Sequence, residues 1–190
     1  ASMTSGCCAR RAARPASGSG DERLREEQRA AVTRSAVVII ASTRAAAGVY
    51  EDRTGPLIVA WLAERGFDVP APVVVTDGAP VGAELRRAIA DGVDVVLTSG
   101  GTGISPTDAT PQATLEVLDY QIPGLADAIR QSGLPHVPTS VLSRGVCGVA
   151  GRTLVVNLPG SSGGVKDGLG VLAGVLDHAL DQLSGKDHAR

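Results

Sequence analysis

A glycine-rich run between an apolar stretch and a helix start is the part of the chain best suited to chemistry. It begins Thr-Ser-Gly-Gly-Thr-Gly at Thr98 and continues to Thr110-Pro111. Glycines expose backbone amides, which can wrap an anionic group together with nearby hydroxyls. The alternative is a glycine-rich turn that binds nothing. The candidate anion-binding residues of this loop are Ser99, Gly100, Gly101, Thr102 and Gly103.

The familiar nucleotide-binding patterns do not fit this loop. A dinucleotide fingerprint needs a third glycine where Pro106 stands, and the only Gly-Lys pair, Gly185-Lys186, is followed by Asp187 rather than Ser or Thr. The sequence therefore predicts a different kind of phosphate cradle.

Two carboxylates accompany the loop. Asp108 stands at its exit, and Asp77 ends an apolar stretch at residues 73–76. A carboxylate beside an anion site repels the anion unless a cation bridges them, and Mg²⁺ usually takes one or two protein carboxylates plus phosphate oxygens. We therefore predict that Asp77 and Asp108 flank one pocket and share Mg²⁺. The alternatives are helix capping for Asp108 and an Asx turn or helix cap for Asp77.

A second loop, Asn157-Leu-Pro-Gly-Ser-Ser-Gly-Gly, repeats the order of strand, glycine turn and helix. Ser161 and the glycine amides can hold another polar group, whereas the alternative is a simple chain reversal. Lys166 can reach ligand or solvent. Arg44, after the first apolar stretch, can meet a phosphate or remain a surface residue.

The elements that must position these loops are strands separated by helices. Continuous apolar runs with β-branched residues indicate strands that are covered on both faces, as in parallel sheets. Glycine- and hydroxyl-rich turns follow them, and open α/β sheets bind ligands at such carboxyl ends. The predicted strands are Val37–Ala41, Val73–Thr76, Val93–Thr98 and Thr153–Leu158.

Helix boundaries support the same architecture. Thr54 with Pro56 opens a helix that Gly66 closes, and Pro80 opens another that Gly92 closes. A final helix carries one apolar stripe from Val165 to Leu183. We predict a three-layer α/β/α domain with a mostly parallel sheet over residues 35–185, preceded by a flexible tail at 1–34 or, alternatively, a tail with a surface helix over Glu22–Val32.

Composition excludes several classes of protein. The chain has 190 residues, of which 43% are hydrophobic and 20% charged, so it can fill a core and is not a disordered adaptor. A net charge of −2 and four aromatic residues argue against nucleic-acid binding. No apolar run approaches the roughly 20 residues that cross a bilayer, so no membrane partner is expected.

Cysteine usage predicts a reducing, cytoplasmic location. Cys7, Cys8 and Cys147 are odd in number and lack the spacing of a disulfide framework or a zinc site. Cys147 lies between apolar residues and is expected to be buried. The histidines show no metal-ligand spacing, and no covalent nucleophile is indicated.

The motifs together resemble the molybdopterin-binding family of molybdenum cofactor biosynthesis. The resemblance extends from Ser35 to about Leu183 and rests on separate motifs in matching order. These are Thr98–Gly103 with Asp108–Pro111, Pro123-Gly124-Leu125, Ser143-Arg144, Asn157–Gly160 and the stretch Ala46–Asp52.

This resemblance implies a homotrimer that transfers AMP from Mg-ATP to the terminal phosphate of molybdopterin and releases pyrophosphate. A partner enzyme would then insert molybdate. It implies catalytic, Mg²⁺-binding roles for Asp108 and Asp77, and it adds to Ser99–Gly103 a second set of substrate-binding residues. That set is Asn157, Pro159, Gly160, Ser161 and Gly164.

Two departures concern substrate contacts. Ser42-Thr43 stands where many relatives have Ser-Asp, and Ser162 stands where a proline is common. The alternatives are a non-catalytic molybdopterin carrier or scaffold trimer, and a sugar- or nucleotide-modifying α/β enzyme with convergent glycine loops.

Overall fold

A six-stranded sheet with the order β2-β1-β3-β6-β5-β4 organises the protein. The computed structural model describes residues 33–49, 51–134 and 136–185. Strands β2, β1, β3 and β6 are parallel, whereas β5 runs antiparallel to β6 and β4 antiparallel to β5. The strands are β1 (Ala36–Ala41), β2 (Val73–Val75), β3 (Val95–Ser99), β4 (Tyr120–Gln121), β5 (Cys147–Ala150) and β6 (Thr153–Leu158).

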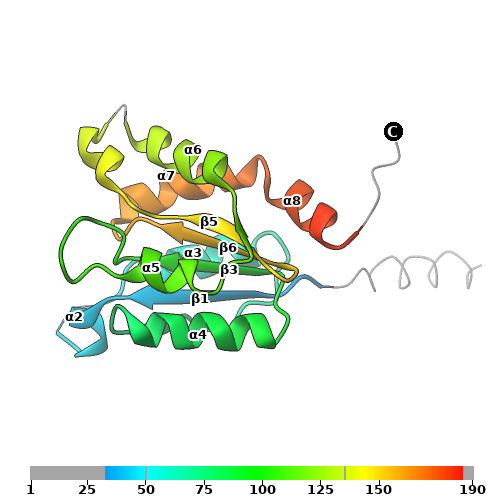
Figure 1. Ribbon diagram of the computed structural model, residues 1–190, viewed down its shortest axis with the longest axis horizontal. Helices are drawn as coiled ribbons and strands as arrows, with labels where there is room; N and C mark the ends of the chain where they lie inside the picture. Colours follow the sequence, from blue (N-terminus) through cyan, green and yellow to red (C-terminus); the bar gives the residue numbers. More distant parts are fainter. Residues whose placement is uncertain (1–32, 50, 135, 186–190) are drawn as a thin grey trace, which may run out of the picture. The chain divides into compact units, whose positions relative to one another are not determined.

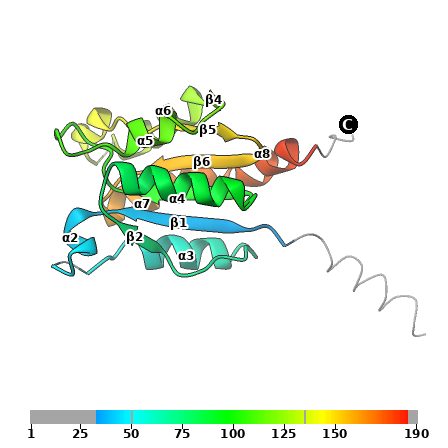
Figure 2. The same ribbon diagram turned by 60° about the horizontal axis from the view of Figure 1, so that its bottom comes forward.

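Helices cover both faces of this sheet (Figures 1 and 2). One face carries α4 and α5, and the opposite face carries α3, α6, α7 and α8, as the two apolar clusters show. The helices are α2 (Thr43–Ala46), α3 (Gly55–Ala63), α4 (Ala79–Ala90), α5 (Thr110–Leu115), α6 (Pro123–Gly133), the 3₁₀ helix η1 (Pro138–Leu142), α7 (Ser162–Ala173) and α8 (Leu176–Leu183). The predicted three-layer α/β/α architecture is confirmed.

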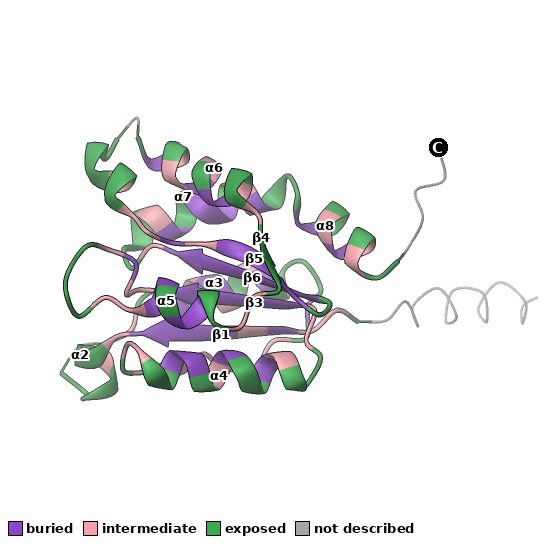
Figure 3. Cartoon of the chain, viewed as in Figure 1, coloured by how far each residue is buried: buried purple, intermediate pink, exposed green. Residues whose placement is uncertain are grey.

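The core lies on both sides of the central strands, which are buried while the outer helix faces are exposed (Figure 3). Alternate residues of β1 point to opposite layers: Val38 and Ile40 pack with α3 and α7, whereas Ile39 packs with α4. Every residue of β3 is buried. Burial on both faces explains why these strands read as continuous apolar runs in the sequence.

The final helix departs from the prediction of one continuous helix. It divides at Gly174 and Val175, whose amides bond to carbonyls three residues back, so the turn tightens and the chain changes direction. The apolar stripe still faces the core, because Leu172 at the end of α7 and Leu176 at the start of α8 are both buried. The stripe therefore identified the buried face correctly, although it could not reveal the break.

Strands β4 and β5 were not predicted. β5 contains Gly148, over which the carbonyl oxygen of Tyr120 lies so closely that a Cβ there would come within 2.4 Å of it. β4 is two residues long. A short strand with a glycine inside it gives little periodic signal, so the antiparallel extension was visible only in the folded chain.

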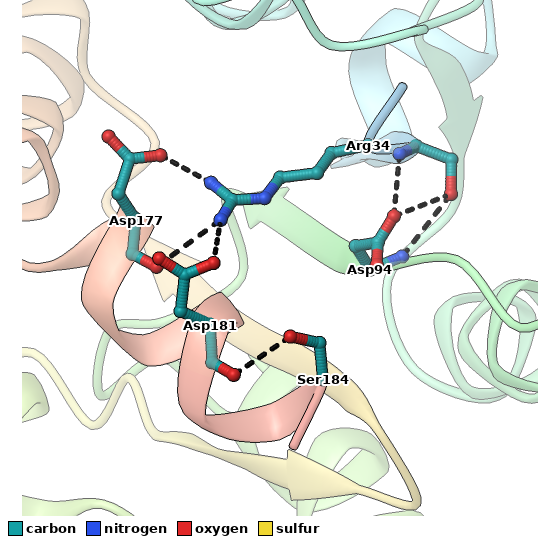
Figure 4. Close-up of polar contacts among 6 residues, drawn as sticks. Arg34, Asp94, Asp177, Asp181 and Ser184 are labelled. Carbon is teal, nitrogen blue, oxygen red and sulfur yellow. Dashed lines mark hydrogen bonds and ion pairs between the residues drawn. The ribbon is translucent and has the colours of Figure 1, made fainter. Parts of the chain in front are cut away.

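The start of β1 is fastened to α8 (Figure 4). Arg34 forms ion pairs with Asp177 and Asp181, and Asp94 accepts a hydrogen bond from the Ser35 amide at 2.7 Å. Arg34 thus belongs to the packed part of the chain. The tail was predicted over residues 1–34. Its residues 1–32, which include the alternative helix over Glu22–Val32, lie outside the described residues.

Candidate functional site

The carboxyl ends of β1, β3 and β6 meet at a cavity of about 500 Å³, here called the central cavity. These strands are neighbours in the sheet, and the chain leaves β1 toward β2 on one side and returns to β3 on the other. Open α/β sheets bind ligands at this kind of reversal. The walls come from Ile40–Ser42, Arg44, Ala45, Asp52–Thr54, Ser99, Gly100 and Gly160–Ser162.

Two glycines allow the strand ends to approach one another. Gly100 has a positive φ of 97°, and a Cβ there would lie 2.3 Å from the carbonyl oxygen of Ala41. Gly160 packs on Gly100 so closely that a Cβ on Gly160 would lie 3.2 Å from the Gly100 Cα. Ser99 donates a hydrogen bond to the Pro159 carbonyl at 2.9 Å. The loops after β3 and β6 are therefore held against the end of β1.

Asp77 and Asp108 line a second cavity of about 310 Å³ together with Gly101, here called the acidic cavity. Strand β1 separates the strands that precede these residues, yet the loop after β3 crosses the end of β1 and meets Asp77. The Asp77 carboxylate accepts hydrogen bonds from the Ala109 amide at 3.1 Å and the Thr110 hydroxyl at 2.9 Å. The structure thus brings together the two acids singled out by the sequence.

The surroundings of the two carboxylates differ. Asp77 also accepts the Gly78 amide at 2.7 Å, so it is bonded from three sides. The Asp108 side chain lies over Gly103, where a Cβ would come within 2.6 Å of its Oδ2. No hydrogen bond or ion pair to the Asp108 carboxylate is found among the described residues. Asp108 is therefore the carboxylate with fewer hydrogen bonds among the described residues, and both acids line the acidic cavity.

These carboxylates fit a magnesium ion that is held jointly with phosphate oxygens. In the part of the chain that the structure describes, no group of three or more His, Cys, Asp or Glu side chains is placed to enclose a metal. Mg²⁺ does not need such an enclosure, because it commonly binds through one or two carboxylates, substrate phosphates and water. Asp108 supplies the more available carboxylate and Asp77 the other.

A third cavity of about 530 Å³, here called the lateral cavity, has a more apolar wall. Ile104, Val137 and Leu142 lie along it with at least 47% of each exposed, and Ser161 belongs both to this cavity and to the central one. Walls with apolar side chains and a few polar groups are typical of small-molecule sites. Of the predicted substrate-binding residues, it contains Thr102, Gly103, Pro159, Ser161 and Gly164.

Asn157 lines none of these three cavities. Its amide is buried, donates to the Thr98 and Thr114 hydroxyls at 2.9 and 3.0 Å, and accepts from the Val146 amide at 3.1 Å. A buried amide with every group bonded rigidifies the segments that it joins. Asn157 therefore fixes the ends of β3 and β6 relative to each other, and the two glycine loops begin at those ends.

Positively charged or polarised groups border the cavities beside the carboxylates. The twelve-residue helix α7 begins at the cavities, where Ser161 caps it by accepting the Gly164 amide at 3.1 Å. A helix amino terminus carries partial positive charge and free amide donors. Arg44 borders both the central and acidic cavities, and Arg53 borders the central one. Lys166 is exposed and lines none of the three.

Sequence reasoning missed residues that reach the site from other elements. Asp52 accepts hydrogen bonds from the Thr54 and Gly55 amides at 2.9 and 3.1 Å, and this turn before α3 holds Arg53 at the central cavity. An aspartate just before a predicted helix start commonly bonds the amides that follow it, so this signal could have been found. Arg144 was noted only as part of a motif, and its contact with the glycine loop has no local signal.

The remaining titratable group of interest lies away from the cavities. Cys147 is buried, and this burial raises the pKa of its thiol from 9.0 to about 12. The predicted burial of Cys147 is confirmed, and the protonated thiol is a packing residue rather than a nucleophile. Among the described helices, none is both long and apolar enough to pass through a bilayer.

Fold and site together define a doubly wound α/β protein with its cavities at the carboxyl ends of the parallel strands. Residues 37–178 match the family model described as "Probable molybdopterin binding domain". The chain belongs to this molybdopterin-binding family.

Named relatives and solved structures are consistent with this family assignment. The molybdopterin adenylyltransferase of Haemophilus influenzae is 40% identical over 141 residues, covering 72% of this chain and 70% of that protein. The molybdenum cofactor biosynthesis bifunctional protein of Synechococcus elongatus is 39% identical over 148 residues, covering 77% of this chain and 46% of that protein. This chain thus spans less than half of that relative. The molybdopterin biosynthesis Mog protein from Mycobacterium ulcerans has 67% identity and a TM-score of 0.77, covering 79% of this chain and 99% of that one.

Proposed function

We propose that this chain is a molybdopterin adenylyltransferase, which transfers AMP from Mg-ATP to the terminal phosphate of molybdopterin and releases pyrophosphate. Family membership and relatives of that name support the proposal. The observation that carries it is that the three cavities adjoin one another. The central cavity shares Ala41, Ser42 and Arg44 with the acidic cavity, and it shares Ser161 with the lateral cavity. Two anionic reactants can therefore meet between Gly100 and Ser161.

In this reaction an oxygen of the terminal molybdopterin phosphate attacks the α-phosphorus of ATP. The new bond joins that oxygen to the α-phosphorus, and the bond from the α-phosphorus to the bridging oxygen of pyrophosphate breaks, so that pyrophosphate leaves with the electron pair. No protein nucleophile is required. The chain's own contribution is to align both phosphates and to place donors where negative charge accumulates.

The residues divide this work by position. Backbone amides of Gly101–Gly103 and of the α7 amino terminus would donate to the phosphates, because the Gly100 amide is already bonded to the Leu158 carbonyl. Arg44 and Arg53 add positive charge at the rim. The apolar wall of the lateral cavity holds a heterocycle and keeps water from that side. Asn157, bonded to Thr98 and Thr114, keeps the two glycine loops in register.

Asp108, assisted by Asp77, would hold Mg²⁺ at the acidic cavity. When bound, the ion supplies positive charge that reduces repulsion between the two phosphates and stabilises the charge of the leaving pyrophosphate. Asp77 has a second duty, since its bonds to Ala109 and Thr110 fix the end of the glycine loop.

Pyrophosphate release from ATP, molybdopterin and Mg²⁺ tests the proposal. We expect turnover by the unaltered chain, and we expect Asp108→Asn to lower kcat about 100-fold or more while molybdopterin affinity changes by less than about threefold. The matched control is Asp91→Asn, which removes the same charge from an exposed residue at the far end of α4.

The alternatives give different results. If the chain binds molybdopterin but releases no pyrophosphate, it is a carrier or scaffold. If molybdopterin does not bind at all, the glycine loops serve another anionic substrate, and the proposal is wrong.

The proposal includes a cytoplasmic homotrimer that passes adenylylated molybdopterin to a molybdate-inserting enzyme. Support for self-association comes from partly exposed apolar residues around η1 and the adjoining loop. They are Ile104, Leu134, Val137, Val141 and Leu142. Apolar side chains gathered on one surface commonly mark an interface.

A further inference from the structure

Arg144 binds the glycine loop at three points. Its amide donates to the Thr102 carbonyl at 2.7 Å, its Nε donates to the Gly103 carbonyl at 2.6 Å, and its Nη2 donates to the Asp108 carbonyl at 2.5 Å. Gly103 and Asp108 are the two ends of an outward turn. One guanidinium therefore binds both ends of the turn, and this pair of hydrogen bonds is here called the clasp.

The turn has few other attachments. Its internal hydrogen bonds involve Ser105, whose carbonyl accepts the Asp108 amide at 3.0 Å and whose hydroxyl lies 2.9 Å from that of Thr107. Residues 104–107 are exposed. In the described chain, both hydrogen bonds between residues 103–108 and the rest of the protein come from the Arg144 guanidinium. Without that group, the turn would be anchored only through its neighbours.

The clasp also affects the position of the Asp108 carboxylate. Holding the Gly103 and Asp108 carbonyls together keeps the Asp108 side chain beside Gly103, so close that a Cβ on Gly103 would lie 2.6 Å from its Oδ2. Arg144 touches backbone oxygens and is not ion-paired with Asp108 in the described chain, so it leaves that carboxylate available.

Arg144 is itself held in place by α6. The guanidinium of Arg130 donates to the carbonyls of Ser143 and Gly145, on either side of Arg144, at 3.3 and 2.9 Å. Arg130, Ser143 and Gly103 all line the lateral cavity, whereas Asp108 lines the acidic cavity. Arg144 therefore links the wall of the lateral cavity to the backbone of Asp108, which lines the acidic cavity.

We propose that Arg144 is a positioning residue that clasps the 103–108 turn and so aims the Asp108 carboxylate for adenylyl transfer. The expected effect on kcat rests on the proposed function. The expected effect on the stability of the turn rests on the hydrogen bonds of Arg144 alone. Lysine cannot replace arginine here, because a guanidinium reaches two carbonyls with a rigid fork, whereas an ammonium group is a single point of donation.

The test compares Arg144→Lys and Arg144→Met with Arg152→Lys, a control in the exposed turn between β5 and β6. In the clasp variants we expect kcat to fall about 10- to 100-fold, because small misplacements of reacting groups cost that much. KM for ATP and molybdopterin should change less than about threefold. Combined with Asp108→Asn, Arg144→Lys should lower kcat less than about twofold further, since the two residues act as one unit.

Amide hydrogen exchange gives a second measurement that needs no substrate. Exchange over residues 103–109 should quicken at least about tenfold in both clasp variants, while the strands β1, β3 and β6 keep their protection. Unchanged kcat, multiplicative losses with Asp108→Asn, or quickened exchange across the whole sheet would each overturn the proposal. Should the unaltered chain release no pyrophosphate, the proposed function fails, and local exchange still decides whether Arg144 is the clasp.

Discussion

At Gly101, beside the acidic cavity, the structure leaves no space for a side chain. It has a positive φ of 61°, and a Cβ there would lie 2.0 Å from Oδ2 of Asp77 and 2.5 Å from the Thr110 hydroxyl. A side chain would therefore strain the backbone and displace the carboxylate that holds the loop.

Gly101→Ala is expected to lower the free energy of unfolding by about 1–3 kcal/mol and to remove most adenylyl transfer. Urea unfolding and pyrophosphate release measure the two effects. The control is Gly170→Ala, in an exposed part of α7 where a Cβ meets nothing within 4 Å and should stabilise the helix by up to about 1 kcal/mol. Equal behaviour of the two variants would contradict this account of the loop.

Cys147 predicts a pH dependence that is confined to alkaline conditions. Its pKa is raised to about 12 in the folded chain, chiefly by burial, from an ordinary value of 9.0. The folded state therefore favours the protonated thiol, and this contribution to stability is complete below pH 9 and is lost as the pH rises from 9 toward 12.

Urea unfolding of the unaltered chain and of Cys147→Ala at about pH 8 and about pH 10.5 measures that contribution. Between these pH values the unaltered chain should lose more stability than the variant, because the variant has no thiol to ionise. Equal losses in both proteins would show that the thiol is not protected by the fold. The comparison cancels the titration of lysines and tyrosines, which both proteins share.

At the scale of elements, the contact between the start of β1 and α8 joins the two ends of the domain. Arg34 is paired with Asp177, whose side chain is 84% exposed, and with Asp181, whose side chain is 36% exposed. Exposed ion pairs contribute little, because solvent and salt screen them.

Arg34→Ala should therefore lower the free energy of unfolding by no more than about 1 kcal/mol, and salt at about 1 M should remove most of the difference. Thermal or urea unfolding at low and high salt measures this. Arg152→Ala, in the turn before β6, serves as the control for losing one exposed arginine. A larger loss, unaffected by salt, would mean that Arg34 acts by packing rather than by charge.

At the scale of the whole molecule, three adjoining cavities lie along the carboxyl edge of β1, β3 and β6. The acidic cavity supplies carboxylates, the central cavity supplies glycine backbone and arginines, and the lateral cavity supplies an apolar wall. The exposed apolar residues around η1 border the last of these, so self-association at that surface would also affect the lateral cavity.

Light scattering coupled to size-exclusion chromatography tests the assembly. We expect a mass three times that of one chain at micromolar concentration. Replacing Val141, which is 56% exposed, with Glu should shift the population toward the single chain if the surface around η1 forms the contact. A trimer that resists this change would place the interface elsewhere, and a single-chain mass for the unaltered protein would rule out the homotrimer.

Much of this fold was predictable because its signals are local. The strands β1, β3 and β6 are buried on both faces and produce continuous apolar runs, and β2 is a shorter apolar run at the sheet edge. Glycine, proline and hydroxyl residues mark the ends of these runs. The prediction failed for β4, β5 and the break between α7 and α8, where the determining contacts come from distant segments. Gly148, for example, owes its place in β5 to the carbonyl of Tyr120.

The sequence by itself determined the architecture, the two glycine-rich loops at strand ends, and Asp77 and Asp108 as acids that accompany them, because each depends on residue type and short spacing. Tertiary structure alone decided that Asp77 meets Thr110 across the end of β1, that Asn157 is buried beneath the loops, and that Arg144 clasps Gly103 to Asp108. These relations join residues 33, 43 and 36–41 positions apart. Local patterns cannot encode such distances, which arise only when the sheet brings its strand ends together.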